Sequence, residues 1–217
     1  MSLYGVQSLI GFKLYLITDR NLFADDYSLF TAVVETLKAG VKAIQLREKD
    51  LEIRELLAMA YKMREVTKKY KAKFFINDRV DVALAVDADG VHLGQMSIPP
   101  SAVRKIAGDK LMIGASTHSL KEALEAEKGG ADFITLGPVY RTPSKLKYGE
   151  PIGIDTLKKV KSEVSIPVIA IGGIKTGMVK EVMDAGADGI ALISGILGAV
   201  AINSAAKNYI MRVNGDI

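Results

Sequence analysis

Eight short apolar runs, rich in valine and isoleucine, alternate along the chain with longer segments of helical periodicity. The runs cover residues 13–19, 41–47, 72–78, 90–94, 111–117, 132–138, 167–173 and 189–195. The helical segments between them include residues 51–70, 119–129, 155–163 and 176–185. Continuous apolar runs are typical of strands buried on both faces of a parallel sheet. Eight strands with a helix after each predict an α/β fold, a single (β/α)8 TIM barrel that forms one domain over residues 1–217.

A short sequence similarity recurs at every second unit of this pattern. It reads AGVKAIQL from Ala39, VDADGVHL from Val86, GGADFITL from Gly129 and AGADGIAL from Ala185. Each copy runs from a helix end into a strand, before the second, fourth, sixth and eighth strands. A barrel built from similar quarters shows such a repeat, which favours the barrel over an open doubly wound sheet. The same residue types also suit any tight turn from helix to strand.

Composition excludes several classes of site. The 217 residues, 49% hydrophobic and 25% charged, are enough for one well-buried core. The absence of cysteine excludes disulfides, zinc–thiolate sites and thiol nucleophiles, and two histidines are too few for a His-rich metal site. The net charge of +4 does not indicate nucleic acid, because basic residues alternate with Glu on helical segments such as 52–71. An excess of positive charge equally suits a small phosphorylated substrate.

The apolar segments do not indicate export or membrane insertion. Residues 1–12 lack the basic start and the cleavage site of a signal peptide. The longest apolar run, residues 190–202, is interrupted by Ser194, Gly195 and Gly198 and is shorter than the ~20 residues of a membrane helix. We therefore expect a cytoplasmic protein without nucleic-acid or membrane partners, and the sequence is compatible with a homo-oligomer.

Polar residues gather where the predicted strands end. In a barrel of this kind the functional face lies at the C-terminal ends of the strands, whereas the strand starts carry mainly Gly, Ala and Pro here. The pattern predicts one polar pocket at that face. The strand-end residues, in chain order, are Thr18, Asp19, Gln45, Arg47, Lys49, Asn77, Asp78, Gln95, Ser97, Ser116, Thr117, His118, Gly137, Pro138, Gly172, Gly173, Ser194 and Gly195.

The segment QLREKD, residues 45–50, indicates an anionic ligand. Side chains alternate along a strand, so Gln45 and Arg47 share one side, and Lys49 continues on it if the chain stays extended. Cations buried there without a partner would be unfavourable by several kcal/mol, which favours a phosphate or diphosphate ligand. The alternative is that Arg47 pairs with Glu48 or Asp19 in a structural network.

The segment FINDR, residues 75–79, has two interpretations. Asn77 or Asp78 is suited to cap the helix that starts near Val80. Beside Arg47 and Lys49, however, the Asp78 carboxylate also suits a Mg²⁺ ion held against a diphosphate, and we favour this second interpretation. The mid-strand His92 is predicted to be an interior residue rather than a ligand.

Two further segments suit phosphate groups. The long loop over residues 137–153 follows the sixth strand, and it supplies hydroxyls and a cation at Thr142, Ser144 and Lys145. The segments IAIGGI and LISGI end the seventh and eighth strands with exposed backbone amides near helix starts, which is the usual phosphate site of such barrels.

Several of these segments together resemble the thiamine phosphate synthase family and its relative, the thiazole tautomerase TenI. They are LYLITD, QLREKD, FINDRVDVALAVDADGVHLGQ, IGASTHSLKEA, GADFITLGPVYRTPSK, PVIAIGGI and GADGIALISGI. The resemblance runs from Lys13 to Ile196. It implies an enzyme that couples hydroxymethylpyrimidine diphosphate with hydroxyethylthiazole phosphate, giving thiamine phosphate and pyrophosphate.

The resemblance also implies roles for individual positions. The segment around Gln45, Arg47 and Lys49, with Asn77, would bind the pyrimidine diphosphate; Ser116 would lie near the pyrimidine and Lys145 on the diphosphate. The loop from Thr142 to Ser144, with Gly173, Ile193 and Ser194, would hold the thiazole phosphate. The full implied substrate-binding set is Gln45, Leu46, Arg47, Glu48, Lys49, Asn77, Ser116, Thr142, Pro143, Ser144, Lys145, Gly173, Ile193 and Ser194. The implied catalytic residues are Arg47, Lys49, Ser116, Lys145 and His118.

The chain departs from the family pattern at one metal ligand. Asp78 matches one Mg²⁺ ligand, but Ser97 stands where the synthase carries the second aspartate. We therefore predict weaker Mg²⁺ binding, and a metal-free site stays open. The alternatives are a TenI-like tautomerase, which needs no metal and uses a histidine at the position of His118 as general base, or a non-catalytic protein that binds thiazole or thiamine phosphates.

Overall fold

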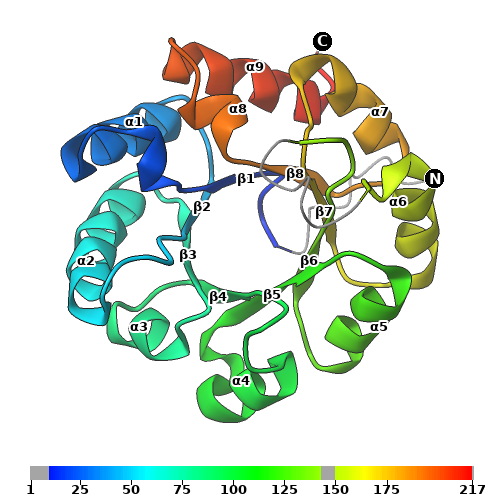
Figure 1. Cartoon of the computed structure of the whole chain (residues 1–217), viewed down its shortest axis with the longest axis horizontal. Coiled ribbons are helices and arrows are strands. Elements are labelled where there is room, and N and C mark those ends of the chain that lie inside the picture. The colour runs from blue at the N-terminus through cyan, green and yellow to red at the C-terminus, as the bar shows by residue number, and fades with distance from the viewer. Residues whose placement is uncertain (1–9, 143–149, 217) are drawn as a thin grey trace, which may run out of the picture.

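The centre of the molecule is a closed ring of parallel strands (Figure 1). The computed structural model describes residues 10–142 and 150–216, and within them each strand pairs with its neighbours in sequence while β1 pairs with β8. The predicted (β/α)8 barrel is confirmed, because each predicted run contains one strand. The strands are β1 Leu14–Ile17, β2 Ala43–Leu46, β3 Lys73–Asn77, β4 Gly90–Leu93, β5 Met112–Thr117, β6 Phe133–Leu136, β7 Val168–Ile171 and β8 Gly189–Leu192.

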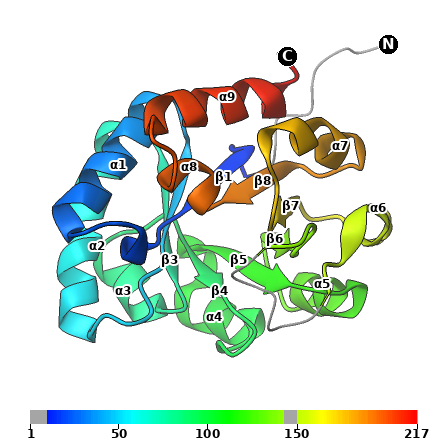
Figure 2. The same ribbon diagram turned by 45° about the horizontal axis from the view of Figure 1, so that its top comes forward.

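Helices surround this ring. The predicted helix over residues 176–185 begins as a 3-10 turn and continues as α7, and α9 packs against both α1 and α7 (Figure 2). None of the helices in the described part of the chain is long and apolar enough to cross a membrane. The α-helices are α1 Asp26–Lys38, α2 Ile53–Lys69, α3 Val80–Ala85, α4 Pro100–Ala107, α5 Leu120–Lys128, α6 Gly153–Glu163, α7 Val179–Asp184, α8 Ser194–Leu197 and α9 Ile202–Asn214; the 3-10 helices are η1 Arg20–Leu22, η2 Gly108–Lys110 and η4 Thr176–Met178.

Alternation along the strands produces two separate cores. In β1, Leu14 and Leu16 point outward and pack in the cluster between sheet and helices, whereas Tyr15 and Ile17 point into the barrel. The inner cluster also contains Phe75 and residues contributed from before β1. Because both the inward-facing and the outward-facing side chains are buried, each strand is a continuous apolar run in the sequence.

The helix-to-strand turns of the recurring sequence share one backbone geometry. The second residue of each copy has a positive φ: 110° at Gly40, 49° at Asp87, 88° at Gly130 and 96° at Gly186. The left-handed conformation ends a helix and lets the chain turn sharply into the next strand. The same turn precedes β3, where Lys71 has a φ of 53° outside the recurring sequence. The left-handed turn therefore explains why three of the four copies of the recurring sequence carry glycine at this position.

The aspartate of the recurring sequence has a structural role of its own. Asp89, Asp132 and Asp188 precede β4, β6 and β8, and each accepts the backbone N–H of a residue on the preceding strand, at 2.6 to 2.9 Å. Each aspartate also forms an ion pair with a cation on α2, α4 or α6, the helix that leads into the preceding strand. These cations are Arg64, Arg104 and Lys161. In three of the four copies, this aspartate thus connects a helix and two strands, whereas the copy before β2 carries Lys42 at that position.

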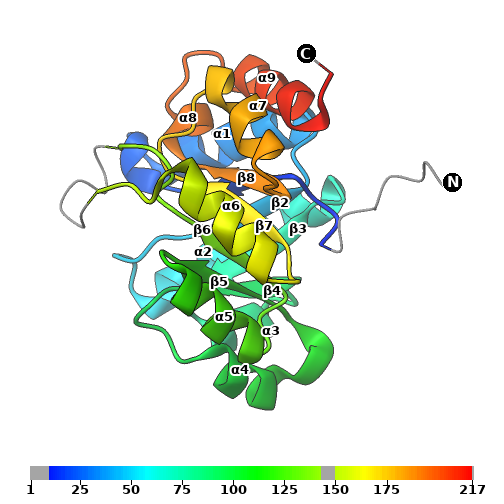
Figure 3. The same ribbon diagram turned by 90° about the vertical axis from the view of Figure 1, so that its right-hand side faces the viewer.

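All eight strands run in the same direction, so their C-terminal ends open onto one end of the barrel. In the side view of Figure 3, the turn after β1 and the loop after β2 lie at that same end. The described residues form this one barrel. A single domain over the whole of residues 1–217 stays a prediction.

The Asp89 tie predicts a measurable contribution to stability. Asp89 accepts from Arg64 Nη1 at 2.6 Å, Lys73 Nζ at 3.2 Å and the Phe74 backbone N–H at 2.9 Å. Asp89→Asn keeps the shape but removes the charge, and we expect a loss of about 1 to 2 kcal/mol in the free energy of unfolding, measured by urea titration. The control Asp184→Asn breaks an exposed helical pair and should change it by less than about 0.5 kcal/mol. Equal effects would contradict the structural role of Asp89.

Candidate active site at the C-terminal end of the barrel

A layer of aromatic rings fills the middle of the barrel. Phe12, Tyr15, Phe75 and Phe133 contact one another with ring centroids 5.3 to 5.8 Å apart. Most of these pairs are edge-to-face, the geometry that aromatic rings prefer. Phe12 lies before β1 and therefore enters from the N-terminal end. The aromatic layer leaves only the C-terminal end of the barrel to receive a ligand.

Polar side chains follow the aromatic layer toward the C-terminal end. Gln45, 1% exposed, donates from Nε2 to the Tyr15 hydroxyl at 3.0 Å, and burial raises the pKa of Tyr15 well above its usual value. His92 Nε2 lies 3.1 Å from Ser116 Oγ and 3.3 Å from Thr135 Oγ1. His92 is thus an interior residue, as predicted.

The contacts of His92 indicate its tautomer. Its Nδ1 is buried with no hydrogen-bond partner in the described residues, and Gly114 leaves room for it, since a Cβ there would stand 2.5 Å from this nitrogen. A buried N–H without a partner is rarer than a buried acceptor without one. We therefore assign the proton to Nε2, which donates to Ser116 Oγ and leaves the Ser116 hydroxyl proton free to point toward a ligand.

Asp78 connects the ends of β3 and β4. Its carboxylate accepts from the Gly94 backbone N–H at 3.0 Å, from the Ser97 hydroxyl and from Asn77 Nδ2 at 2.7 Å. Its backbone has a φ of 61°, in the left-handed region. The alternative that Asp78 caps α3 is wrong, because Arg79 occupies the N-cap position and the Asp78 carboxylate is engaged elsewhere.

The charge at Asp78 is stabilised by its neighbours. Lys49 Nζ lies 3.4 Å from Oδ2 of the carboxylate. Burial alone would raise the pKa of Asp78, but the hydrogen bonds from Ser97 and Gly94, together with Lys49, outweigh burial and hold the pKa below its ordinary value. The carboxylate is therefore ionised at neutral pH and able to face a cation.

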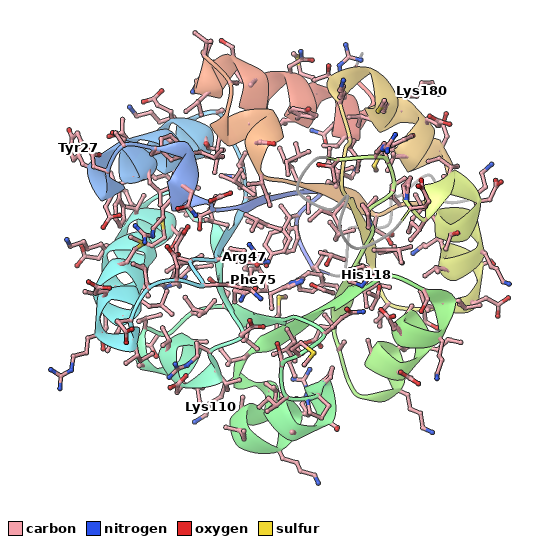
Figure 4. The ribbon with its side chains drawn as sticks, in the orientation of Figure 1. Tyr27, Arg47, Phe75, Lys110, His118 and Lys180 are labelled. Atoms are coloured by element: carbon pink, nitrogen blue, oxygen red, sulfur yellow. The ribbon has the colours of Figure 1, made fainter. Side chains whose placement is uncertain are left out.

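Arg47 points into the same end of the barrel. Figure 4 shows Arg47 and Phe75 inside the ring of strands, whereas Tyr27 and Lys180 lie on its outside. Within residues 10–142 and 150–216, the Arg47 guanidinium makes no ion pair or side-chain hydrogen bond, so the predicted alternative pairing with Glu48 or Asp19 is not observed. A half-buried guanidinium of this kind is available to an anionic ligand.

Two residues of the implied substrate-binding set face away from the barrel interior. Leu46 is fully buried in the outer core between sheet and helices. Glu48 is 4% exposed and accepts from the Thr18 hydroxyl and the Arg20 backbone N–H. Alternation turns both side chains to the side opposite Arg47, and a contact of either residue with substrate stays a prediction.

His118 lies directly before α5 and has a carboxylate partner. Glu122, four residues later, accepts from the His118 backbone N–H at 2.8 Å and lies 3.3 Å from its Nδ1. Gln95, from the loop after β4, donates to the same oxygen of Glu122 at 2.9 Å. The sequence reasoning overlooked Glu122, although the His118–Glu122 spacing of four residues places both on one face of a helical turn.

The phosphate segments lie at the ends of β6, β7 and β8. Gly172 and Gly173 have φ values of 98° and 69°, and a Cβ on either would collide with the loop after β6. The close packing of these two loops therefore explains why both positions are glycine, and no bound ligand is needed for that explanation. Ile193 packs against the inner cluster and Ser194 opens the short α8, whose first amides have no acceptor within a helix. Thr142 ends the described part of the loop, and the implied residues Pro143, Ser144 and Lys145 lie outside the described residues.

Comparison with known proteins decides the family. The family model described as thiamine monophosphate synthase matches residues 14–196. The chain belongs to the thiamine monophosphate synthase family. It is 46% identical over 198 residues to a thiamine-phosphate synthase from Clostridium novyi, covering 91% of this chain and 97% of that one. It is 49% identical over 198 residues to a thiamine-phosphate synthase from Halalkalibacterium halodurans, covering 91% and 93%.

A solved structure of the same family has the same fold. The thiamine phosphate pyrophosphorylase from Pyrococcus furiosus superposes with a TM-score of 0.86 at 44% identity, covering 94% of this chain and 96% of that one. The family resemblance read from the sequence is therefore confirmed.

The buried His92 predicts a pH dependence of stability. Burial lowers its pKa to about 3, chiefly by desolvation. The folded protein thus binds a proton less readily than the unfolded chain, and stability that is present above pH 6.5 is lost as the pH falls. We expect the free energy of unfolding to decrease by roughly 1 to 2 kcal/mol between pH 6.5 and pH 5, measured by urea titration. His92→Gln should flatten the dependence in this window, and an unchanged slope in that variant would contradict the assignment.

Proposed function

We propose that this chain is a thiamine phosphate synthase that couples hydroxymethylpyrimidine diphosphate with hydroxyethylthiazole phosphate. The observation that carries the proposal is the Arg47 guanidinium, which has no acidic partner among the described residues and lies inside the ring of strands, together with the Lys49–Asp78 pair at the strand ends. Such a site suits a diphosphate better than a neutral ligand, because it presents cations in a partly desolvated place. The family and the names of the relatives agree with this reaction.

The reaction needs stabilisation of a departing anion. The bond between the pyrimidine methylene carbon and the diphosphate oxygen breaks, and the thiazole nitrogen forms a new bond to that carbon. Negative charge accumulates on the leaving pyrophosphate as positive charge develops on the pyrimidine. In our proposal Arg47 and Lys49 neutralise the pyrophosphate, which is the contribution that usually dominates such catalysis. Lys145, outside the described residues, belongs to the same proposed set.

The uncharged layer below the cations would hold the pyrimidine. Gln45 and Asn77 offer amide groups at this level, and Ser116 offers a hydroxyl whose oxygen is fixed by His92. Because His92 stays neutral, it adds no positive charge that would oppose a pyrimidine cation. The aromatic layer beneath excludes water from one side of the ring.

The thiazole phosphate would lie at the other side of the mouth. We assign it to the amides of Gly173, Ile193 and Ser194 and to the loop that begins at Thr142. Backbone amides at a helix start and in left-handed glycine turns are suited to phosphate oxygens. This division leaves the diphosphate on the β2–β4 side and the phosphate on the β7–β8 side, with the reacting atoms between them.

The residues present fit a magnesium ion with a reduced set of protein ligands. Asp78 is ionised, and the neighbouring Ser97 donates a hydrogen bond to it instead of supplying a second carboxylate. The described residues contain no group of three or more acidic, histidine or cysteine side chains arranged for a metal. Mg²⁺ is commonly held by one or two carboxylates with substrate phosphates and waters, so Asp78 suffices when a diphosphate is bound. The ion would supply additional neutralisation of the pyrophosphate.

A second candidate function rests on His118. Its ring is oriented by the Glu122 carboxylate, an arrangement suited to a general base, and Ser97 removes a metal ligand that a thiazole tautomerase does not need. The retained cations at positions 47 and 49 favour the synthase, because a tautomerase binds no diphosphate.

The deciding experiment is a product assay with purified protein, both phosphorylated substrates and millimolar Mg²⁺. We expect formation of thiamine phosphate and pyrophosphate. Arg47→Gln should lower kcat/KM by roughly two orders of magnitude, because it removes charge stabilisation of the leaving group. The matched control Arg79→Gln changes an exposed arginine paired with Asp81 and should stay within about twofold of the unchanged protein.

Three other outcomes separate the alternatives. Isomerisation of the thiazole carboxylate phosphate without thiamine phosphate, abolished by His118→Asn, would establish the tautomerase. Binding of thiazole or thiamine phosphates without any turnover would establish a binding protein. Equal effects of the substitutions at Arg47 and Arg79 would contradict the role of the barrel mouth even if product forms.

A further inference from the structure

The cations at Arg47 and Lys49 stand on a segment that belongs to neither strand nor helix. β2 ends at Leu46 and α2 begins at Ile53. Within the described residues, the backbone of residues 47–51 makes no sheet-ladder or α-helical hydrogen bond, and the Leu51 N–H reaches the Glu48 carbonyl only at 3.5 Å. Precise placement of a catalytic cation requires such a segment to be fixed by other groups.

Thr18 supplies the first of these groups. Its backbone N–H donates to the Gln45 carbonyl at 2.9 Å, the last backbone bond from β1 to this part of β2. Beyond that point the Arg47 N–H donates to Thr18 Oγ1 at 3.0 Å. The Thr18 hydroxyl thus adds one hydrogen bond to the pairing of β1 and β2, and this bond holds the backbone of Arg47.

Glu48 determines the direction of this hydroxyl. The Thr18 hydroxyl has a single proton, and it is donated to Glu48 Oε1, so the oxygen lone pairs face the Arg47 N–H. Glu48 Oε2 accepts the Arg20 backbone N–H at 3.0 Å, which ties the turn after β1 to the same carboxylate. Thr18 is fully buried and Glu48 is 4% exposed. These bonds are therefore shielded from competing water.

A second connection between the two segments is weaker. Arg20 Nη2 pairs with Asp50 Oδ2 at 2.5 Å, but the side chains are 32% and 50% exposed. Exposed ion pairs contribute little because water and salt screen them. Glu48 is thus the principal link between the turn after β1 and the segment that carries both cations.

We propose that Glu48 is a positioning residue that fixes the backbone of residues 47–49 and so aims Arg47 and Lys49 at the diphosphate. It lies between them in sequence and on the opposite side of the chain. In this role it acts through the backbone, because its carboxylate is engaged by the Thr18 hydroxyl and the Arg20 N–H. The inference rests on the proposed function only for the identity of the anion, because the hydrogen-bond chain exists without any ligand.

Three variants test the proposal by two independent readouts. The first readout is hydrogen exchange of the Arg47 amide, followed by NMR, which needs no substrate. The second is calorimetric binding of inorganic pyrophosphate with Mg²⁺. In Glu48→Ala and in Thr18→Val we expect the Arg47 amide to lose protection and the Kd for pyrophosphate to rise by about tenfold or more, because misplaced cations bind the anion poorly. Glu48→Gln, which keeps the size of the side chain, should show a smaller rise.

The controls separate positioning from other effects. Asp50→Asn breaks only the exposed pair and should leave both readouts within about twofold of the unchanged protein. Thr18→Val combined with Glu48→Ala should be no worse than the stronger single variant, since both act through one chain of bonds. If Glu48→Ala does not fold, Glu48→Gln and Thr18→Val still report on the Arg47 amide.

The outcomes also separate this proposal from the proposed function. Unchanged Arg47 protection in Glu48→Gln and Thr18→Val would overturn the positioning role, whether or not the protein makes thiamine phosphate. Lost protection in a protein that makes no thiamine phosphate would support positioning and contradict the synthase. Strictly additive effects of the two substitutions would also contradict a shared chain of bonds.

Discussion

The functional end of this barrel depends on the hydrogen-bonded carboxylate of Asp78. It connects the ends of two strands by accepting from the Gly94 N–H and the Ser97 hydroxyl, and it holds Lys49 from a third segment. The arrangement keeps Asp78 ionised and leaves Arg47 without a competing acidic partner among the described residues.

Polarity changes in steps along the barrel axis, and the order of the steps follows from the cost of burial. Aromatic rings fill the middle of the barrel, and neutral groups such as Gln45 and His92 lie next to them toward the C-terminal end. Among the described side chains inside the barrel, the full charges lie near the mouth. Charges deeper in the barrel would be unfavourable without partners. The same order suits a ligand with an uncharged ring and a charged diphosphate, since each part meets groups of matching polarity.

The sequence predicts the fold well because the strands are buried on both faces and the turns before β2, β4, β6 and β8 share one backbone geometry. It does not decide the role of Asp78, since a cap and a ligand position look alike until the pairing of β3 with β4 brings Gly94 and Ser97 to the carboxylate. Alternation does place Glu48 opposite Arg47, but its link to Thr18 depends on the register between β1 and β2. The sequence does indicate the pairing of His118 with Glu122, because residues four apart lie on one face of a helical turn.

The most direct test of this account is the affinity for Mn²⁺, measured by electron paramagnetic resonance in the presence of pyrophosphate, for the unchanged protein and for Ser97→Asp. If Ser97 occupies the place of a second metal ligand beside Asp78, the new carboxylate should tighten Mn²⁺ binding by on the order of tenfold. Ser101→Asp adds the same charge at an exposed position of α4 and should have little effect. Equal affinities for the unchanged protein and Ser97→Asp would contradict a metal site at Asp78.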